Sequence, residues 1–294
     1  MQLAHVSITP EARAAVRARL GTLFTDPPTL DADADVTPVL PRTGDVPGMW
    51  VTAPGVTLDA GVTIYVHGGG FSHSNPAMEQ IMAHRLSRAT GRPAFAVDYR
   101  LAPAHPYPAA VDDVVAVHRS LLAQDVPAGR ILLAGESAGG TLLLSALLVL
   151  ADAGDPLPAG AVAVSPITDF TDSSPSIRTN KGLDLIDPDI MGPIGEQYLA
   201  GASPDQAPQS PLYGDLRGLP PLLIVAGGDE VLLDDSRHFA EAASAAGVDT
   251  AFDVYDGMPH AFHAVVLSPY DAHLPTATTF LRRVADWTAR LPVA

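Results

Sequence analysis

The sequence predicts an α/β fold with a mostly parallel central sheet, helices on both faces of that sheet and a helical cap. Six short β-type runs alternate with helical stretches, and the chain between successive runs is long enough for crossover connections. Two irregular segments fall outside this alternation and are typical of lids. Because 294 residues can enclose one large hydrophobic core, we expect a single α/β domain.

Each element of this fold is placed by a local pattern. The β-type runs are, in chain order, VTIYVHG, PAFAVDY, RILLAGE, GAVAVSP, PLLIVAGG and TAFDVYDG. The expected helices span residues 78–90, 109–123, 138–153, 236–246 and 274–291. The opening stretch MQLAHVSITPEARAAVRARL lacks the apolar core of a signal peptide, which predicts a short amphipathic helix and a cytoplasmic protein.

The two irregular segments define the expected organisation of the chain. Residues 1–44 contain the proline- and aspartate-rich stretch TDPPTLDADADVTPVLP, and residues 168–218 are rich in Pro, Asp, Ser and Gly. Long irregular insertions in a compact domain are commonly lids or binding loops. We therefore expect an N-terminal cap segment over 1–44 and a main domain over 45–294 that carries a second cap insertion at about 168–218.

Composition excludes several classes of function. Acidic residues outnumber basic ones by 33 to 17, and the net charge of −16 repels nucleic acids and anionic membranes. The sequence has no cysteine, so it has no disulfide, thiol nucleophile or thiolate metal site. The most apolar stretch, 137–151, is shorter than the roughly 20 residues that span a bilayer. We expect a small-molecule partner rather than nucleic acid or membrane.

The motif GESAGG places Ser137 between a predicted strand and a predicted helix. A purely structural interpretation is a helix N-cap, the commonest use of a serine before a helix. The functional interpretation is the G-x-S-x-G nucleophile turn, which requires this strand-to-helix context. The neighbouring glycines allow a sharp turn that exposes the hydroxyl, and the amide of Ala138 is free to donate to a developing oxyanion.

A second motif, HGGGF, follows an apolar strand. A flexible turn is the bland interpretation, and the motif lacks the lysine of a P-loop and the spacing of a dinucleotide site. Together with the serine turn it indicates an oxyanion loop, in which Gly68, Gly69 and Gly70 are the candidate amide donors. We expect His67 to hold this loop rather than act as a base.

A candidate base lies in YDGMPHAFH, which follows the last predicted strand. In enzymes built on such a serine turn, the chain order is nucleophile, acid, histidine, which favours His260. His263 reaches the same face if the segment is helical, so a metal-binding pair is the alternative. No acidic or third histidine ligand lies near it in sequence, and we expect no metal.

These motifs together resemble the hormone-sensitive-lipase-like esterases, the bacterial family IV of α/β-hydrolases, from about Tyr65 to Phe262. Besides HGGGF and GESAGG, the stretch DYRLAPAHPYPAA resembles the family signature YRLAPExxFPAA, with Ala104 in place of the usual glutamate. SPITDFT and YDGMPHAF match further family segments. The resemblance implies a serine carboxylesterase for short acyl esters that uses no metal or cofactor.

The resemblance also bears on finer features of the site and the assembly. It favours the second and third glycines of HGGG as oxyanion donors. It makes a homodimer through an edge strand near 250–255 plausible, with a monomer as the competing state. The same fold hosts ligand-binding proteins that have lost catalysis, and the same triad serves amidases and lactonases. These remain alternatives to an esterase.

The triad acid is the least obvious assignment. LPPLLIVAGGDEVLLDDS resembles the family stretch in which DPLLDDS follows a strand, with the first aspartate as the acid. Counting without gaps from either end places that position on Glu230, while Asp229 is the rival because it has the usual residue type. Glutamate has a similar reference pKa and orients an imidazole equally well. We expect Asp234 and Asp235 to begin the next helix.

Overall fold

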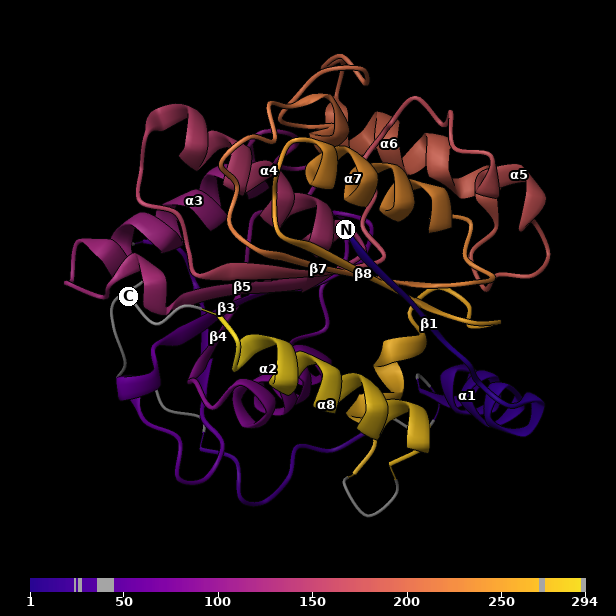
Figure 1. The fold of residues 1–294 in the computed structure, drawn as a ribbon, viewed down its shortest axis with the longest axis horizontal. Helices are drawn as coiled ribbons and strands as arrows, with labels where there is room; N and C mark the ends of the chain where they lie inside the picture. Colours follow the sequence, from indigo (N-terminus) through magenta and orange to yellow (C-terminus); the bar gives the residue numbers. More distant parts are fainter. Residues whose placement is uncertain (24, 26–27, 36–44, 270–272, 292–294) are drawn as a thin grey trace.

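An eight-stranded sheet runs through the centre of the molecule in the order β1-β8-β7-β6-β5-β3-β4-β2 (Figure 1). The structure is a computed structural model, and it describes residues 1–23, 25, 28–35, 45–269 and 273–291. The strands are β1 (Gln2–Val6), β2 (Gly48–Val51), β3 (Val62–Val66), β4 (Ala94–Val97), β5 (Ile131–Glu136), β6 (Gly160–Val164), β7 (Leu222–Gly227) and β8 (Thr250–Tyr255). All neighbouring strands pair in parallel except β2 with β4. The six predicted strands are confirmed as β3 to β8.

The predicted helices are also present, with small differences at their ends. The helices are α1 (Pro10–Thr22), α2 (Pro76–Thr90), α3 (Ala109–Leu122), α4 (Ala138–Ala153), α5 (Ser176–Thr179), α6 (Met191–Leu199), α7 (Leu233–Ala245) and α8 (Pro275–Thr288). Helix α2 starts two residues earlier than expected because the Asn75 side chain accepts from the Met78 amide and Pro76 occupies the first turn. Helix α7 starts at Leu233 and holds Asp234 and Asp235 in its first turn, as expected.

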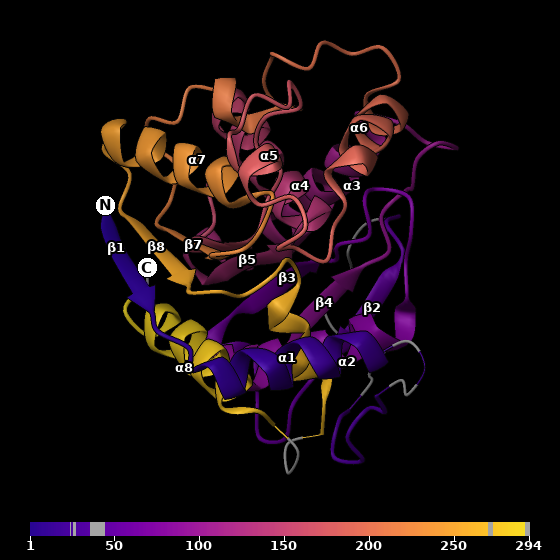
Figure 2. The same ribbon diagram turned by 90° about the vertical axis from the view of Figure 1, so that its right-hand side faces the viewer.

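Two apolar layers sandwich the sheet, because alternate residues of each strand point to opposite faces. On β5, Ile131 and Leu133 pack into the layer under α3, α4 and α7, whereas Leu132 and Ala134 pack into the layer under α2 and α8. Figures 1 and 2 show these two groups of helices on opposite sides of the sheet. The confirmed fold is therefore an α/β sheet covered on both faces.

The N-terminal segment contains the expected short helix and, before it, a strand. Its first residues form β1, which pairs in parallel with β8 so that Gln2 lies opposite Ala251 and Val6 lies opposite Tyr255. Helix α1 follows and packs near α8 and the 3₁₀ helix η5 (Phe262–Leu267) (Figure 2). Strand β8 is thus an interior strand, and the expectation that residues 250–255 form an edge strand is wrong. Residues 36–44 of the expected cap lie outside the described residues.

The second irregular segment, 168–218, contains α5 and α6 and lies on the same side of the sheet as α3, α4 and α7 (Figures 1 and 2). The first turn of α7 anchors it. The Asp235 carboxylate accepts the amides of Thr168 and Asp169 at 2.9 and 3.1 Å, and Asp234 accepts the Ser176 amide at 2.9 Å. Within the described residues, no helix combines the length and apolar character needed to cross a bilayer.

Candidate active site

Ser137 occupies a sharp turn between β5 and α4. Its backbone has φ 53° and ψ −123°, a conformation that is strained for a residue with a side chain. The turn needs small neighbours because a Cβ at Gly135 or Gly139 would collide with the Val66 carbonyl of the adjacent strand. The hydroxyl therefore stands at the carboxyl end of the sheet, and Ser137 makes no side-chain capping hydrogen bond.

Three side chains from separate loops meet at this position. The Oγ of Ser137 lies 3.0 Å from Nε2 of His260, and Nδ1 of His260 lies 3.3 Å from Oε2 of Glu230. The loops follow β5, β8 and β7, whose parallel ends meet at one edge of the sheet. Glu230 is fully buried and His260 is 6% exposed, whereas Ser137 is half-buried, so the carboxylate and the imidazole are shielded from bulk water.

The Glu230 carboxylate is held from two further sides. Its Oε1 accepts a hydrogen bond from the Ser165 hydroxyl at 2.7 Å and another from the Gly227 amide. Because both donors bind Oε1, the other oxygen, Oε2, faces the imidazole of His260. Ser165 follows β6, opens the segment SPITDFT and has a φ of 52°; its contact with Glu230 was not predicted from the sequence.

Asp229, the rival acid, points elsewhere. Its carboxylate pairs with Arg17 of α1 at 2.9 Å, and its side chain is 29% exposed. The pair links the N-terminal helix to the loop that follows β7. In this geometry Glu230, and not Asp229, contacts His260.

The charges around His260 favour its protonated form. Burial alone lowers the pKa of the imidazole, but the hydrogen bond and charge of Glu230, with the charges of Asp184 and Glu136, outweigh burial and raise it. Such an environment stabilises the imidazolium that forms when a histidine accepts a proton.

The glycine loop 68–70 packs against the serine turn. A Cβ at Gly68 would lie 3.3 Å from the Cβ of Ser137. The Gly68 amide is already engaged because it donates to Glu136 at 3.0 Å, which removes Gly68 from the candidate oxyanion donors. Among the described residues, none accepts a hydrogen bond from the amides of Gly69, Gly70 or Ala138.

The loop takes its shape from positive backbone φ angles and from a brace beneath it. Gly69 and Gly70 have φ of 112° and 58°. The Tyr99 hydroxyl donates to the His67 carbonyl, and the two rings stack with centroids 4.2 Å apart. Burial lowers the pKa of His67, which lies 2% exposed beneath the loop. Ala104, at the position where the family signature has glutamate, is exposed and leaves this brace intact.

His263 follows His260 on the same loop and makes different contacts. It is buried among aromatic rings, with its centroid 6.0 Å from that of Phe280 and 6.1 Å from that of Phe262. Burial, and secondarily the charge of His260, lowers its pKa to about 3. The imidazole of His263 is therefore neutral, and its ring packs among these aromatic side chains.

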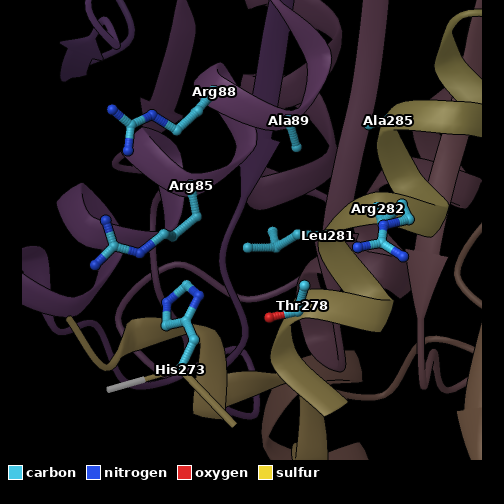
Figure 3. Close-up of a pocket in the computed structure, with 8 residues that line it drawn as sticks. All are labelled: Arg85, Arg88, Ala89, His273, Thr278, Leu281, Arg282 and Ala285. Atoms are coloured by element: carbon cyan, nitrogen blue, oxygen red, sulfur yellow. The ribbon is translucent and has the colours of Figure 1, made fainter. Parts of the chain in front are cut away.

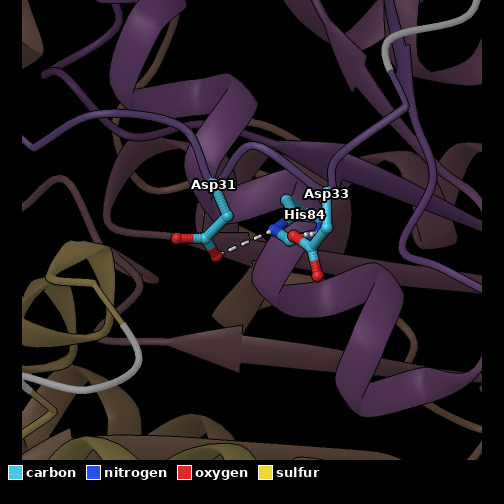
Figure 4. A group of neighbouring side chains, drawn as sticks. All are labelled: Asp31, Asp33 and His84. Atoms are coloured by element: carbon cyan, nitrogen blue, oxygen red, sulfur yellow. Dashed lines mark ion pairs between the residues drawn. The ribbon is translucent and has the colours of Figure 1, made fainter.

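A cavity and a cluster of ionisable side chains lie away from Ser137, His260 and Glu230. A cavity of about 310 Å³ lies between α2 and α8, lined in part by Arg85, Arg88 and Arg282 (Figure 3). A group of neighbouring side chains, Asp31, Asp33 and His84, lies beside α2 (Figure 4). The carboxylates of this group bind Arg85 and Arg88, so guanidinium groups already occupy the positions that a cation would take.

Comparison with known proteins shows the family to which the chain belongs. A family model described as alpha/beta hydrolase fold matches residues 63–264. An acetyl-hydrolase of Streptomyces hygroscopicus is 43% identical over 70% of this chain and 69% of its own length. An esterase of Acinetobacter venetianus is 32% identical over 98% of this chain and 91% of its own length. A crystal structure of an esterase from the bacterial hormone-sensitive lipase family is 38% identical, with a TM-score of 0.84 over 95% of this chain and 90% of that one.

The fold and the matched region define a hydrolase of the α/β class. The chain belongs to the hormone-sensitive-lipase-like esterases of that class, as its motifs indicated. It is a carboxylic ester hydrolase.

Proposed function

We propose that the chain is a serine carboxylesterase in which Ser137 is the nucleophile, His260 the general base and Glu230 the orienting acid. The observation that carries this proposal is the continuous chain of contacts from Ser137 Oγ through both imidazole nitrogens to Glu230 Oε2. A base within hydrogen-bond reach of the hydroxyl and a carboxylate behind the base are the geometric requirements of this chemistry.

The reaction proceeds in two acyl-transfer steps. His260 removes the Ser137 proton as the oxygen attacks the ester carbonyl, and the resulting tetrahedral intermediate expels the alcohol, which takes that proton from the imidazolium. The acyl-enzyme is then attacked by water, which His260 deprotonates, and the carboxylic acid leaves with Ser137 restored. Amides of Gly69, Gly70 and Ala138 are the proposed donors to the oxyanion of both intermediates.

The side chains beside the glycine loop bear on the size of the acyl group of the substrate. Phe71 stacks on Tyr198 with centroids 3.9 Å apart, and Phe170 lies 5.5 Å from the same ring. A Cβ at Gly70 would already contact Ile194 at 3.4 Å. Ile194 thus lies close to the glycine loop, next to a buried aromatic cluster, and we infer that this arrangement favours short acyl chains over long ones.

A chain-length series tests this function. We expect kcat/KM for p-nitrophenyl esters to be highest between acetate and hexanoate and to fall toward palmitate. A maximum at palmitate would contradict the short-chain preference. Matched amides and lactones belong in the same series, since faster turnover of either class would replace esterase by amidase or lactonase, and no turnover of any class would favour a ligand-binding protein.

A further inference from the structure

Asp184 lies in the irregular segment 168–218, outside every motif that the sequence analysis singled out. Its two carboxylate oxygens accept backbone amides from two different loops. Oδ1 accepts the His260 amide at 2.7 Å, and Oδ2 accepts the Val231 amide at 2.8 Å. One side chain therefore joins the loop that carries the imidazole to the loop that carries Glu230.

Asp184 contacts the backbone of both proposed triad loops at or beside the functional residues. Asp184 bonds the amide of His260 itself and the amide next to Glu230, and it reaches them across 76 and 47 residues. A neighbouring side chain reinforces the second loop, because Asn180 Nδ2 donates to the Glu230 carbonyl at 2.8 Å and to the Gly228 carbonyl at 3.3 Å. The segment thus holds the backbone of both loops with side chains.

Hydrogen bonds between a carboxylate and backbone amides are charge-assisted and directional. Because both acceptors belong to one planar group, the separation of the two amides is fixed by the geometry of Asp184. The contact between His260 Nδ1 and Glu230 Oε2, at 3.3 Å, depends on the same separation. A small displacement of either loop lengthens this contact.

We propose that Asp184 is a positioning residue that aligns His260 with Glu230 and couples the irregular segment to the catalytic machinery. The inference rests on the proposed function, since it assigns Asp184 a task within that triad. Segment 168–218 would then help to fix the position of the His260 imidazole, in addition to any role in covering the substrate.

The charge of Asp184 has a second consequence for the base. The ionisable groups that face His260 are Glu230 on the loop after β7, Glu136 at the end of β5, Asp184 on the irregular segment and His263 on its own loop, with the Ser137 hydroxyl at Nε2. Asp184 is one of three carboxylates among them, and its charge favours the imidazolium. Its neutralisation should lower the pKa of His260.

The test compares Asp184→Asn with wild type on p-nitrophenyl butyrate. The asparagine carbonyl replaces only one carboxylate oxygen, and its NH₂ group cannot accept an amide in place of the other, so at least one of the contacts with His260 and Val231 is lost. The Leu185 amide, which also donates to Oδ1, belongs to the same segment as Asp184. We expect kcat to fall by about 10- to 100-fold, with KM changed by less than about threefold, because misalignment of a catalytic group acts on the chemical step. The acid limb of the kcat/KM profile should move to lower pH.

Asp189→Asn is the matched control, because it removes the same charge from the same segment. Asp189 pairs only with the exposed Lys181, at 2.9 Å, among the described side chains. We expect wild-type kcat and an unchanged acid limb. An equal shift in both variants would show a general charge effect and would overturn the positioning role.

An NMR titration of the His260 ring, assigned by loss of its signal in His260→Gln, reads the same effect without turnover. If the wild type hydrolyses no ester, the proposed function fails, and a His260 pKa that falls in Asp184→Asn still supports the contact. If the wild type is an esterase and Asp184→Asn keeps both its kcat and its His260 pKa, the inference is overturned, even where the variant melts at a lower temperature.

Discussion

Glu136 and Gly68 join the serine turn to the glycine loop: the Gly68 amide donates to the Glu136 carboxyl at 3.0 Å. The Tyr65 hydroxyl donates to the same oxygen at 2.7 Å. Burial raises the pKa of Glu136 to about 7, against these two hydrogen bonds that lower it. The residue immediately before the proposed nucleophile thus ties the oxyanion loop in place and is close to half protonated at neutral pH.

The raised pKa of Glu136 predicts a pH-dependent stability. Between about pH 4.5, the ordinary pKa of a glutamate, and about pH 7, the unfolded chain releases this proton while the folded protein retains it. The contribution to stability is therefore complete at low pH and falls as pH rises, by at most about 3 kcal/mol given the partial exposure of the residue. Glu136→Gln cannot ionise and should lose this decline.

Thermal melting at pH 5 and pH 8 measures the effect. The difference in Tm between the two pH values should be smaller in Glu136→Gln than in wild type. Glu241→Gln, which alters an exposed carboxyl on α7, is the control and should keep the wild-type difference. Identical pH dependence in all three proteins would show that burial of Glu136 does not perturb its ionisation.

Replacing each of the two adjacent acids by its amide separates their roles. Glu230→Gln should lower kcat by about 10³- to 10⁴-fold, because an amide no longer orients the imidazole and stabilises its charge. Asp229→Asn should keep kcat within about threefold, since its carboxylate contacts Arg17 and not His260. Both variants are measured at saturating ester. The reverse ranking would transfer the role of acid to Asp229.

The close approach of the serine turn to β3 predicts a strong effect of one methyl group. Gly139→Ala would place a Cβ against the carbonyls of Val66 and His67, so the turn and the glycine loop must separate. We expect esterase activity to fall at least about 100-fold, because a 1 Å misplacement has an effect of this size. Gly21→Ala adds the same methyl in α1 with nothing within 4 Å and should leave activity unchanged. Wild-type activity in Gly139→Ala would contradict the tight packing.

Much of the fold was predictable because its strands and helices carry strong periodic patterns. Strand β5, for example, is an apolar run that leads into the serine turn. Strand β1 was missed because Gln2–Val6 is an exposed edge strand, whose side chains show no buried alternation, and only its pairing with β8 defines it. The expectation of an edge strand at 250–255 was wrong for the same reason.

Some residues of the site were also predictable from local sequence, and others were not. Ser137, His260 and the glycine loop were predictable because each lies in a short sequence motif that specifies both the local turn and the reactive group. Ser165 and Asp184 act through contacts that span 65 and 76 residues, so no local spacing identifies them. The engagement of the Gly68 amide likewise depends on how Glu136 packs, which is set by tertiary structure.

Covalent labelling identifies the nucleophile. A fluorophosphonate should phosphonylate one serine, and peptide mapping by mass spectrometry should place the adduct on Ser137. Ser137→Ala should take up no label and lose ester hydrolysis by several orders of magnitude, because members of a triad act as a unit. An adduct on a different serine, or near-normal hydrolysis by Ser137→Ala, would contradict the assignment.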